Sequence, residues 1–147
     1  MGERPTPTRR DYPYFRAVAT RWMDVDVYGH VNNVVYYSYF DTAVNDYLVQ
    51  AAGLVPAADD VYGIVVETGC TYRKSLRFPE TVDVGVRVTR LGRTSVTYDI
   101  GIFKVGDDDP AAFGRFVHVY VERATQRPTP IPSAHRAALE KLREPVS

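Results

Sequence analysis

Residues 26–53 read DVYGHVNNVVYYSYFDTAVNDYLVQAAG, a short polar segment followed directly by a long amphipathic one. From Asn33 to Ala52, apolar residues recur at steps of three and four, which is the period of an α-helix. The apolar set comprises Tyr37, Phe40, Val44, Leu48 and Ala51, widened by Tyr36, Ala43 and Tyr47. Gly53 follows where a left-handed cap would end the helix. Because the apolar face is so broad, we expect other elements to wrap around this helix.

Alternating apolar and polar residues predict β-strands on both sides of this helix. In chain order we expect a strand over Tyr14–Trp22, a loop over Asp24–Asn32, the helix, strands at Val61–Phe78, 82–88, 96–102 and Phe113–Arg123, and a helix over Ser133–Leu142 capped by Ser133. Gly63 and Gly69 are candidate bulges in the longest strand. This order predicts an α+β fold in which one antiparallel β-sheet is wrapped around a long central α-helix.

The expected sheet also bears on assembly and domain count. A curled sheet has free edges, and an unpaired edge strand favours pairing with another chain, so we expect a homodimer or a homotetramer. The 147 residues fit one domain. We expect a flexible N-terminal arm over residues 1–13, which are rich in proline and arginine, and a single folded domain over residues 14–147.

The composition narrows the function classes. Eighteen basic residues balance eighteen acidic ones, so the net charge gives no electrostatic case for binding nucleic acid or a membrane surface. Cys70 is the only cysteine, which excludes an intrachain disulfide and a cysteine-based zinc site. The sequence shows neither a signal-like leader nor an apolar run near the roughly 20 residues that span a bilayer. We expect a cytoplasmic protein that needs no metal and no cofactor.

The polar segment before the helix is the best candidate for chemistry. It carries two acids, Asp24 and Asp26, together with a glycine, a histidine and two asparagines. The first N–H groups of the following helix are unpaired, and they could stabilise a negatively charged carbonyl oxygen. A nearby carboxylate could act as nucleophile or general base. The structural alternative is that these residues only cap the helix and form a turn, which is common for such clusters.

A family resemblance favours the catalytic interpretation. The segment Asp26-Val27-Tyr28-Gly29-His30-Val31-Asn32-Asn33, followed by Tyr36-Tyr37 and Tyr39-Phe40-Asp41, resembles the signature of the hotdog-fold acyl-CoA thioesterases related to 4-hydroxybenzoyl-CoA thioesterase. The resemblance extends from about Tyr14 to Pro132 and includes Tyr72-Arg73 and the stretch at 89–95. It implies the hotdog fold, and two subunits that join their sheets edge to edge with the active site at their interface.

The resemblance assigns the chemistry to three residues. Asp26 matches the family's catalytic aspartate, which either attacks the thioester carbonyl to give a mixed anhydride or activates a water molecule. Gly29 matches the glycine that lets the thioester approach, and the backbone N–H of Asn33 matches the donor that polarises its carbonyl. Hydrolysis would release a free acid and CoA, so coenzyme A would enter only as part of the substrate.

Other residues of the expected site have structural alternatives. The substrate-binding candidates are Tyr28, His30 and Asn32 in the polar segment, and Glu67 and Thr68 on the following strand. His30 is expected to form a wall of the site, and for Asn32 a turn or cap role has equal weight. Glu67 lies where other hotdog branches place a catalytic carboxylate. With Asp26 in that role, we expect Glu67 to be buried or paired at an interface.

Basic residues are expected to bind the CoA phosphates. Arg93 is the first candidate because it lies at the hairpin that contacts phosphate in the family, and Arg90 lies close to it. For Arg73, Lys74 and Arg77, a solvated charged face is at least as good an explanation. Cys70 lies in a predicted strand with no adjacent histidine, so we expect a small core residue and not a nucleophile.

Three alternative functions share the same fold. An acyl-ACP thioesterase would use the same chemistry on a thioester held by an acyl carrier protein. A non-catalytic acyl-CoA binding module is disfavoured by the presence of Asp26 and Gly29. A hotdog hydratase is disfavoured because the context of Asp26 and His30 does not match its acid and histidine pattern. We therefore expect an acyl-CoA thioesterase that hydrolyses its substrate with Asp26.

Overall fold

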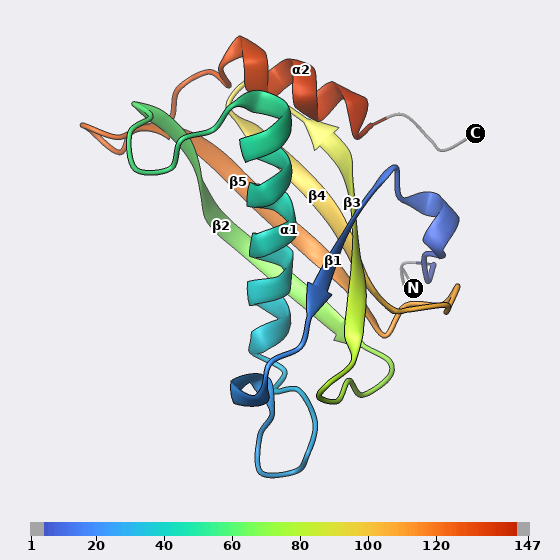
Figure 1. Ribbon diagram of the computed structural model, residues 1–147. Coiled ribbons are helices and arrows are strands. Elements are labelled where there is room, and N and C mark those ends of the chain that lie inside the picture. The colour runs from blue at the N-terminus through green and yellow to red at the C-terminus, as the bar shows by residue number, and fades with distance from the viewer. Residues whose placement is uncertain (1–4, 144–147) are drawn as a thin grey trace.

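The computed structural model describes residues 5–143 and consists of a five-stranded antiparallel sheet that curls around one long helix (Figure 1). Its elements are β1 (Tyr14–Ala19), α1 (Val35–Ala52), β2 (Val61–Tyr72), β3 (Thr81–Leu91), β4 (Ser95–Lys104), β5 (Ala112–Glu122) and α2 (Ser133–Lys141). Two single-turn 3₁₀ helices are η1 (Arg9–Asp11) and η2 (Trp22–Asp24). The strand order is β1-β3-β4-β5-β2, which confirms the predicted hotdog architecture.

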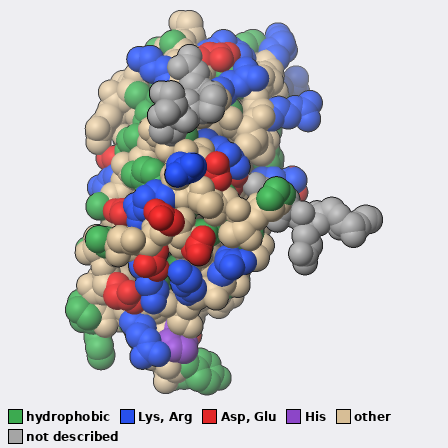
Figure 2. All heavy atoms as spheres, turned by 90° about the vertical axis from the view of Figure 1, so that its right-hand side faces the viewer, with side chains coloured by type: hydrophobic (Ala, Val, Ile, Leu, Met, Phe, Trp, Pro, Cys, Tyr) green, Lys and Arg blue, Asp and Glu red, His purple; other side chains and the backbone are tan. Residues whose placement is uncertain are grey.

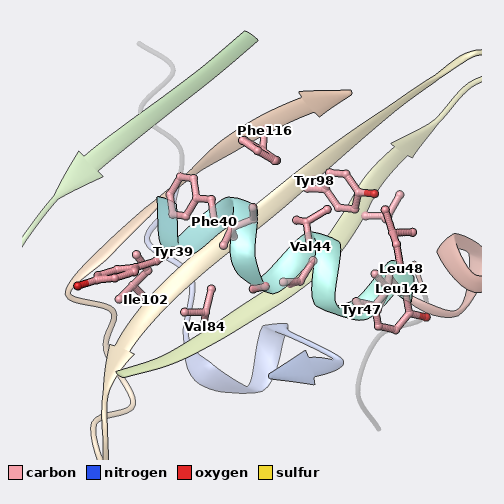
Figure 3. Packing of buried hydrophobic residues seen from close by; sticks show 14 of the residues in the cluster. Tyr39, Phe40, Val44, Tyr47, Leu48, Val84, Tyr98, Ile102, Phe116 and Leu142 are labelled. Atoms are coloured by element: carbon pink, nitrogen blue, oxygen red, sulfur yellow. The ribbon is translucent and has the colours of Figure 1, made fainter. Parts of the chain in front are cut away.

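The core lies between α1 and the concave face of the sheet. Phe40 and Val44 on α1 point toward the strands, where Tyr98 and Phe116 meet them (Figure 3). Val96, Tyr98, Ile100 and Ile102 alternate along β4 and are all buried, as their spacing predicts. Each fully buried side chain of this size contributes about 1.5–3 kcal/mol, so the sheet and the helix stabilise each other.

The ends of α1 are set by backbone hydrogen bonds. Gly53 ends the helix with φ = 71°, the left-handed cap that was predicted. The helix begins at Val35, two residues later than expected, because Asn32 and Asn33 form a turn. In that turn the Asn32 carbonyl accepts from Val35 N at 2.9 Å, and the Asn32 side chain accepts from Val34 N at 3.0 Å.

Two strands are shorter than expected. β1 ends at Ala19, after which η2 forms, and β2 ends at Tyr72. The chain leaves β2 because Arg73 N and Lys74 N both donate to one carbonyl, that of Ala111. The register shift in β2 lies between Val65 and Glu67, so the expectation of bulges at Gly63 and Gly69 was wrong.

One of those two glycines, Gly63, is required by close packing, and the other is not. A Cβ at Gly63 would lie 2.9 Å from Nδ1 of His118. A Cβ at Gly69 would meet nothing within 4 Å; it is the facing Gly114 on β5 that must lack a side chain, because its Cβ would lie 2.0 Å from the Gly69 carbonyl oxygen. The final helix begins at Ser133, but Pro132 occupies the cap position, so the expected Ser133 cap does not form.

Part of the expected N-terminal arm packs on the outer face of the sheet. Tyr12 is buried over β3 and β4, where a Cβ at Gly85 or Gly101 would clash with its ring. Arg9 forms an ion pair with Asp83 at 2.8 Å. Residues 5–13 thus contribute to the packing of the domain expected over 14–147; residues 1–4 and 144–147 lie outside the described residues. On the face shown in Figure 2, acidic and basic side chains are interspersed.

Candidate active site

The polar loop before α1 is closed by its own backbone. Val25 and Val31 form an isolated antiparallel bridge, and Asp26 N donates to the His30 carbonyl at 3.0 Å. The turn inside it is completed by Gly29, whose N–H donates to the Asp26 carbonyl at 3.1 Å. Gly29 has φ = 83°, a conformation that residues with a side chain rarely adopt. The loop therefore holds Asp26 at one fixed position beside the start of α1.

The buried side chain and the backbone of Asp24 hold this loop in place through hydrogen bonds. Its side chain is 1% exposed and accepts hydrogen bonds from the Tyr39 hydroxyl at 2.8 Å and from Arg21 at 2.9 Å. Its carbonyl accepts from Asn32 N at 2.9 Å. Burial alone would raise the pKa of Asp24, but the hydrogen bonds from Arg21 and Tyr39 outweigh burial and lower that pKa below its ordinary value. Asp24 is thus an ionised structural residue.

Asp26 faces a cavity of about 380 Å³ at the N-terminal end of α1. The cavity is lined by Asp26, Tyr28, His30, Val31, Asn33, Tyr36, Tyr72, Arg73, Lys74 and Ser75. One carboxylate oxygen, Oδ1, accepts from Tyr28 N at 2.9 Å. The other oxygen has no hydrogen-bond partner within residues 5–143, so it is available to a molecule in the cavity.

Just before the helix, a residue with an unpaired hydrogen-bond donor lines the same cavity. Asn33 lines it, and the backbone N–H of this residue has no partner in the described part of the chain. The Asn33 carbonyl accepts a hydrogen bond from the Tyr72 hydroxyl at 2.8 Å. An unpaired N–H at a helix start carries partial positive charge. A carboxylate and such a donor in one cavity are the groups that acyl transfer requires.

Several predicted site residues lie together in this cavity, and others do not. Asp26, Tyr28, His30 and Asn33 line it, and Gly29 shapes the loop. Asn32 does not line it, because its side chain accepts from Val34 N and so forms the turn.

Glu67 and Thr68 are placed on β2, away from Asp26. Glu67 pairs with Arg115 on β5, and 59% of its side-chain surface is exposed in the single chain, so it is not buried. The Thr68 hydroxyl donates to the Arg115 carbonyl at 2.9 Å. Glu67 and Arg115 share a separate hollow with Arg90, Thr89 and Thr97.

The turn between β3 and β4 lies near the C-terminal end of α1, whereas the polar loop precedes its N-terminal end (Figure 1), so Arg93 and Asp26 are at opposite ends of the helix. Arg93 occupies the turn between β3 and β4, where Arg136 of α2 donates to the carbonyls of Gly92 and Arg93. An 18-residue helix is about 27 Å long, so one chain does not bring Arg93 to the Asp26 cavity. The basic residues that do line that cavity are Arg73 and Lys74.

Sequence reasoning gave no site role to Tyr72 or Ser75, which also line the cavity together with Tyr36. The signal that could have found Tyr72 is topological. β2 runs back antiparallel along α1, so its last residues return to the helix start. Tyr72 packs its ring edge-on against Tyr36, with centroids 4.9 Å apart.

Cys70, two residues before Tyr72, has a pKa raised to about 11 by burial, so at neutral pH it is a thiol and a poor nucleophile.

Apolar side chains surround the loop on the outside. Trp22, Met23, Val27, Tyr28 and Val34 are all largely exposed, and Val27 is 95% exposed. Among the described residues, no group of acidic, histidine or cysteine side chains could hold a metal ion, and no helix could cross a membrane.

Known structures share this architecture. The chain superposes on the PA5185 protein from Pseudomonas aeruginosa strain PAO1 with a TM-score of 0.93 and 47% identity, covering 95% of this chain and 98% of that one. The PA2801 protein from Pseudomonas aeruginosa, a proposed thioesterase, gives a TM-score of 0.80 and 30% identity over 86% of this chain and 98% of that one. The DHNA-CoA thioesterase from Staphylococcus aureus, at 22% identity and a TM-score of 0.76, shows the shared fold over 86% and 88% of the two chains.

No curated protein sequence matches the chain. The family model described as the thioesterase-like superfamily matches residues 20–139, which include the polar loop, α1 and β2 to β5. The chain therefore belongs to the thioesterase-like superfamily, and it is a thioester hydrolase with the hotdog fold.

Proposed function

We propose that the protein hydrolyses an acyl-CoA to a free acid and CoA, and that Asp26 carries the chemistry. The observation that supports this most directly is the shared cavity. It is lined by Asp26, which has a free carboxylate oxygen, and by Asn33, whose backbone N–H has no partner among residues 5–143. No other acid lines that cavity in the described part of the chain.

The reaction follows from these two groups. The thioester oxygen accepts a hydrogen bond from Asn33 N–H, which stabilises the negative charge that develops as the carbonyl carbon is attacked. Asp26 either attacks that carbon, forming a mixed anhydride and releasing the CoA thiolate, or takes a proton from a water molecule that attacks. In the first case water then hydrolyses the anhydride. A thiol has a pKa near 8.5, so the thiolate leaves with little help from an acid.

The charges and apolar groups around the cavity suit the two halves of an acyl-CoA. Arg73 forms no ion pair among residues 5–143, and its guanidinium donates one hydrogen bond there, to the Thr6 hydroxyl at 3.2 Å. Its guanidinium can therefore meet a phosphate group. Lys74 is already paired with Asp107 at 3.2 Å. The exposed apolar residues beside Asp26, such as Val27, offer a surface for an acyl chain.

A second copy of the chain would complete the site. Within the described structure β2 is an edge strand, and Val65 and Val66 near its middle are 44% and 54% exposed. An exposed edge with apolar side chains favours pairing with another strand. We propose that β2 pairs with β2 of a second copy, which extends the sheet and closes the cavity near Tyr72. Light scattering should give at least a dimer, and an active monomer would contradict this.

The proposed reaction is tested by measuring thiol release from a panel of acyl-CoAs and matching acyl carrier protein thioesters. We expect turnover of at least one acyl-CoA and its loss in Asp26→Asn. Turnover of the carrier protein thioesters alone would assign the alternative substrate. Tight acyl-CoA binding without turnover by the unmodified protein would point to a binding module.

A further inference from the structure

The hydroxyl of Tyr72 reaches across from the sheet to the first turn before α1. Tyr72 is the last residue of β2, and its Oη donates to the Asn33 carbonyl at 2.8 Å. Its ring is held edge-on by Tyr36, which is buried under the helix start. The contact joins two segments that are 39 residues apart in the chain.

The same peptide unit is held from its other side. The unit between Asn33 and Val34 contributes the Asn33 carbonyl and the Val34 N–H. The carbonyl is held by Tyr72, and the N–H donates to the Asn32 side chain at 3.0 Å. With both polar groups of that peptide fixed, the unit cannot rotate without breaking one of the two bonds. The N–H of Asn33, a residue that lines the cavity, adjoins this unit across one Cα, so fixing the unit restricts the direction of that N–H.

We propose that Tyr72 is a positioning residue for thioester hydrolysis, acting through the Asn33–Val34 peptide to fix the direction of the Asn33 N–H. This inference rests on the proposed function of Asp26 and Asn33 and assigns a role to a residue outside the sequence motif. A donor that stabilises a developing oxyanion acts in the transition state more than in the bound substrate. Loss of its alignment should therefore lower kcat and leave KM nearly unchanged.

The Tyr72 hydroxyl stays protonated, so it can donate its hydrogen bond at every assay pH. Burial, followed by the neighbouring Cys70 and Tyr37 side chains, raises the pKa of Tyr72 above its ordinary value. The hydroxyl therefore keeps its proton throughout the range in which a thioesterase is assayed. The contribution of Tyr72 should accordingly be independent of pH between about 6 and 9.

The experiment compares Tyr72→Phe with Tyr62→Phe in thiol release assays. The Tyr62 hydroxyl lies at the other end of β2 and accepts from the Gln126 side chain, outside the Asp26 cavity. We expect Tyr72→Phe to lower kcat about 10- to 100-fold, less than the 10²- to 10³-fold typical of deleting an oxyanion donor, with KM changed less than about twofold. Tyr62→Phe should match the unmodified protein.

A double-mutant cycle with Asn32→Ala gives a second readout. Both changes free the same peptide, so the combined loss in kcat should be clearly smaller than the product of the single losses. Fully multiplicative losses would overturn the shared-peptide mechanism, and so would normal kcat in a folded Tyr72→Phe protein. A rise in KM as large as the fall in kcat would also overturn it, because it would indicate direct substrate binding. If the unmodified protein released no thiol from any thioester, the proposed function itself would fail.

Discussion

Replacing Asp24 with asparagine should destabilise the protein, although the change is nearly isosteric. Asp24 receives four hydrogen bonds: one from the Arg21 backbone N–H, two from the Arg21 guanidinium and one from the Tyr39 hydroxyl. An amide offers one acceptor oxygen and places an NH₂ donor where a second acceptor is needed. At least one donor in this buried position would then be left unpaired.

The magnitude follows from those contacts. Hydrogen bonds to a charged group contribute about 1.5–3 kcal/mol, and a buried donor without a partner costs about 1–3 kcal/mol. The Arg21 side chain is 61% exposed, so solvent screens its share of the interaction. We therefore expect a loss of about 2–4 kcal/mol from the free energy of unfolding. For a domain of this size that lowers the melting temperature by roughly 5–15 °C.

Thermal melts of Asp24→Asn and of the milder Tyr39→Phe test this reasoning. Tyr39→Phe removes one donor and should cost about 1–2 kcal/mol. The pH dependence gives a further check. Because the folded pKa of Asp24 is lowered, its stabilisation is present above the unfolded pKa, near 3.9, and is lost as the pH falls through the lower folded pKa. Asp24→Asn should remove that part of the acid transition. A melting temperature within 1 °C of the unmodified protein would refute the anchoring role.

Two further predictions concern substrate binding and the thiol. Arg73→Ala should raise KM for an acyl-CoA by about tenfold with little change in kcat. The effect should disappear with an acyl-pantetheine, which has no phosphate, and an equal loss with both thioesters would contradict a phosphate contact. Arg93→Ala, measured beside it, should change KM less, unless a second copy brings Arg93 to the site. Cys70→Ser should retain turnover, and alkylation of Cys70 at pH 7.5 should be slow, because burial raises the pKa of its thiol to about 11.

The elements with strong periodicity could be predicted from sequence. Apolar steps of three and four gave α1 and its Gly53 cap, and strict alternation gave β3 and β4. Apart from the Gly53 cap, the ends of elements such as β2 could not, because distant carbonyls decide them. β2 stops at Tyr72 because the next two N–H groups bond the carbonyl of Ala111, about 40 residues later in the chain. The packing of Tyr12 over Gly85 and Gly101 likewise depends on contacts that no local pattern reveals.

In the candidate site too, local sequence predicts some residues, and distant contacts decide the others. Asp26, Gly29 and Asn33 lie within one short motif, so local sequence was sufficient to group them. Tyr72 enters from another strand, and Arg93 is separated from Asp26 by the length of α1. Both facts follow from the path of the chain in three dimensions. A motif search finds residues that are close in sequence, whereas the cavity collects those that are close in space.

The measurement that tests the central claim most directly is the turnover number of Asp26→Asn for a good acyl-CoA substrate. Asparagine has nearly the same shape as aspartate, but it is a poor nucleophile and a poor base. With the protein folded and its assembly unchanged, kcat should fall by about 10²- to 10⁴-fold, the range expected for loss of a positioned base or nucleophile. Asp24→Asn, assayed well below its melting temperature, should lose far less. Near-normal thiol release by folded Asp26→Asn would contradict the assignment of the chemistry to Asp26.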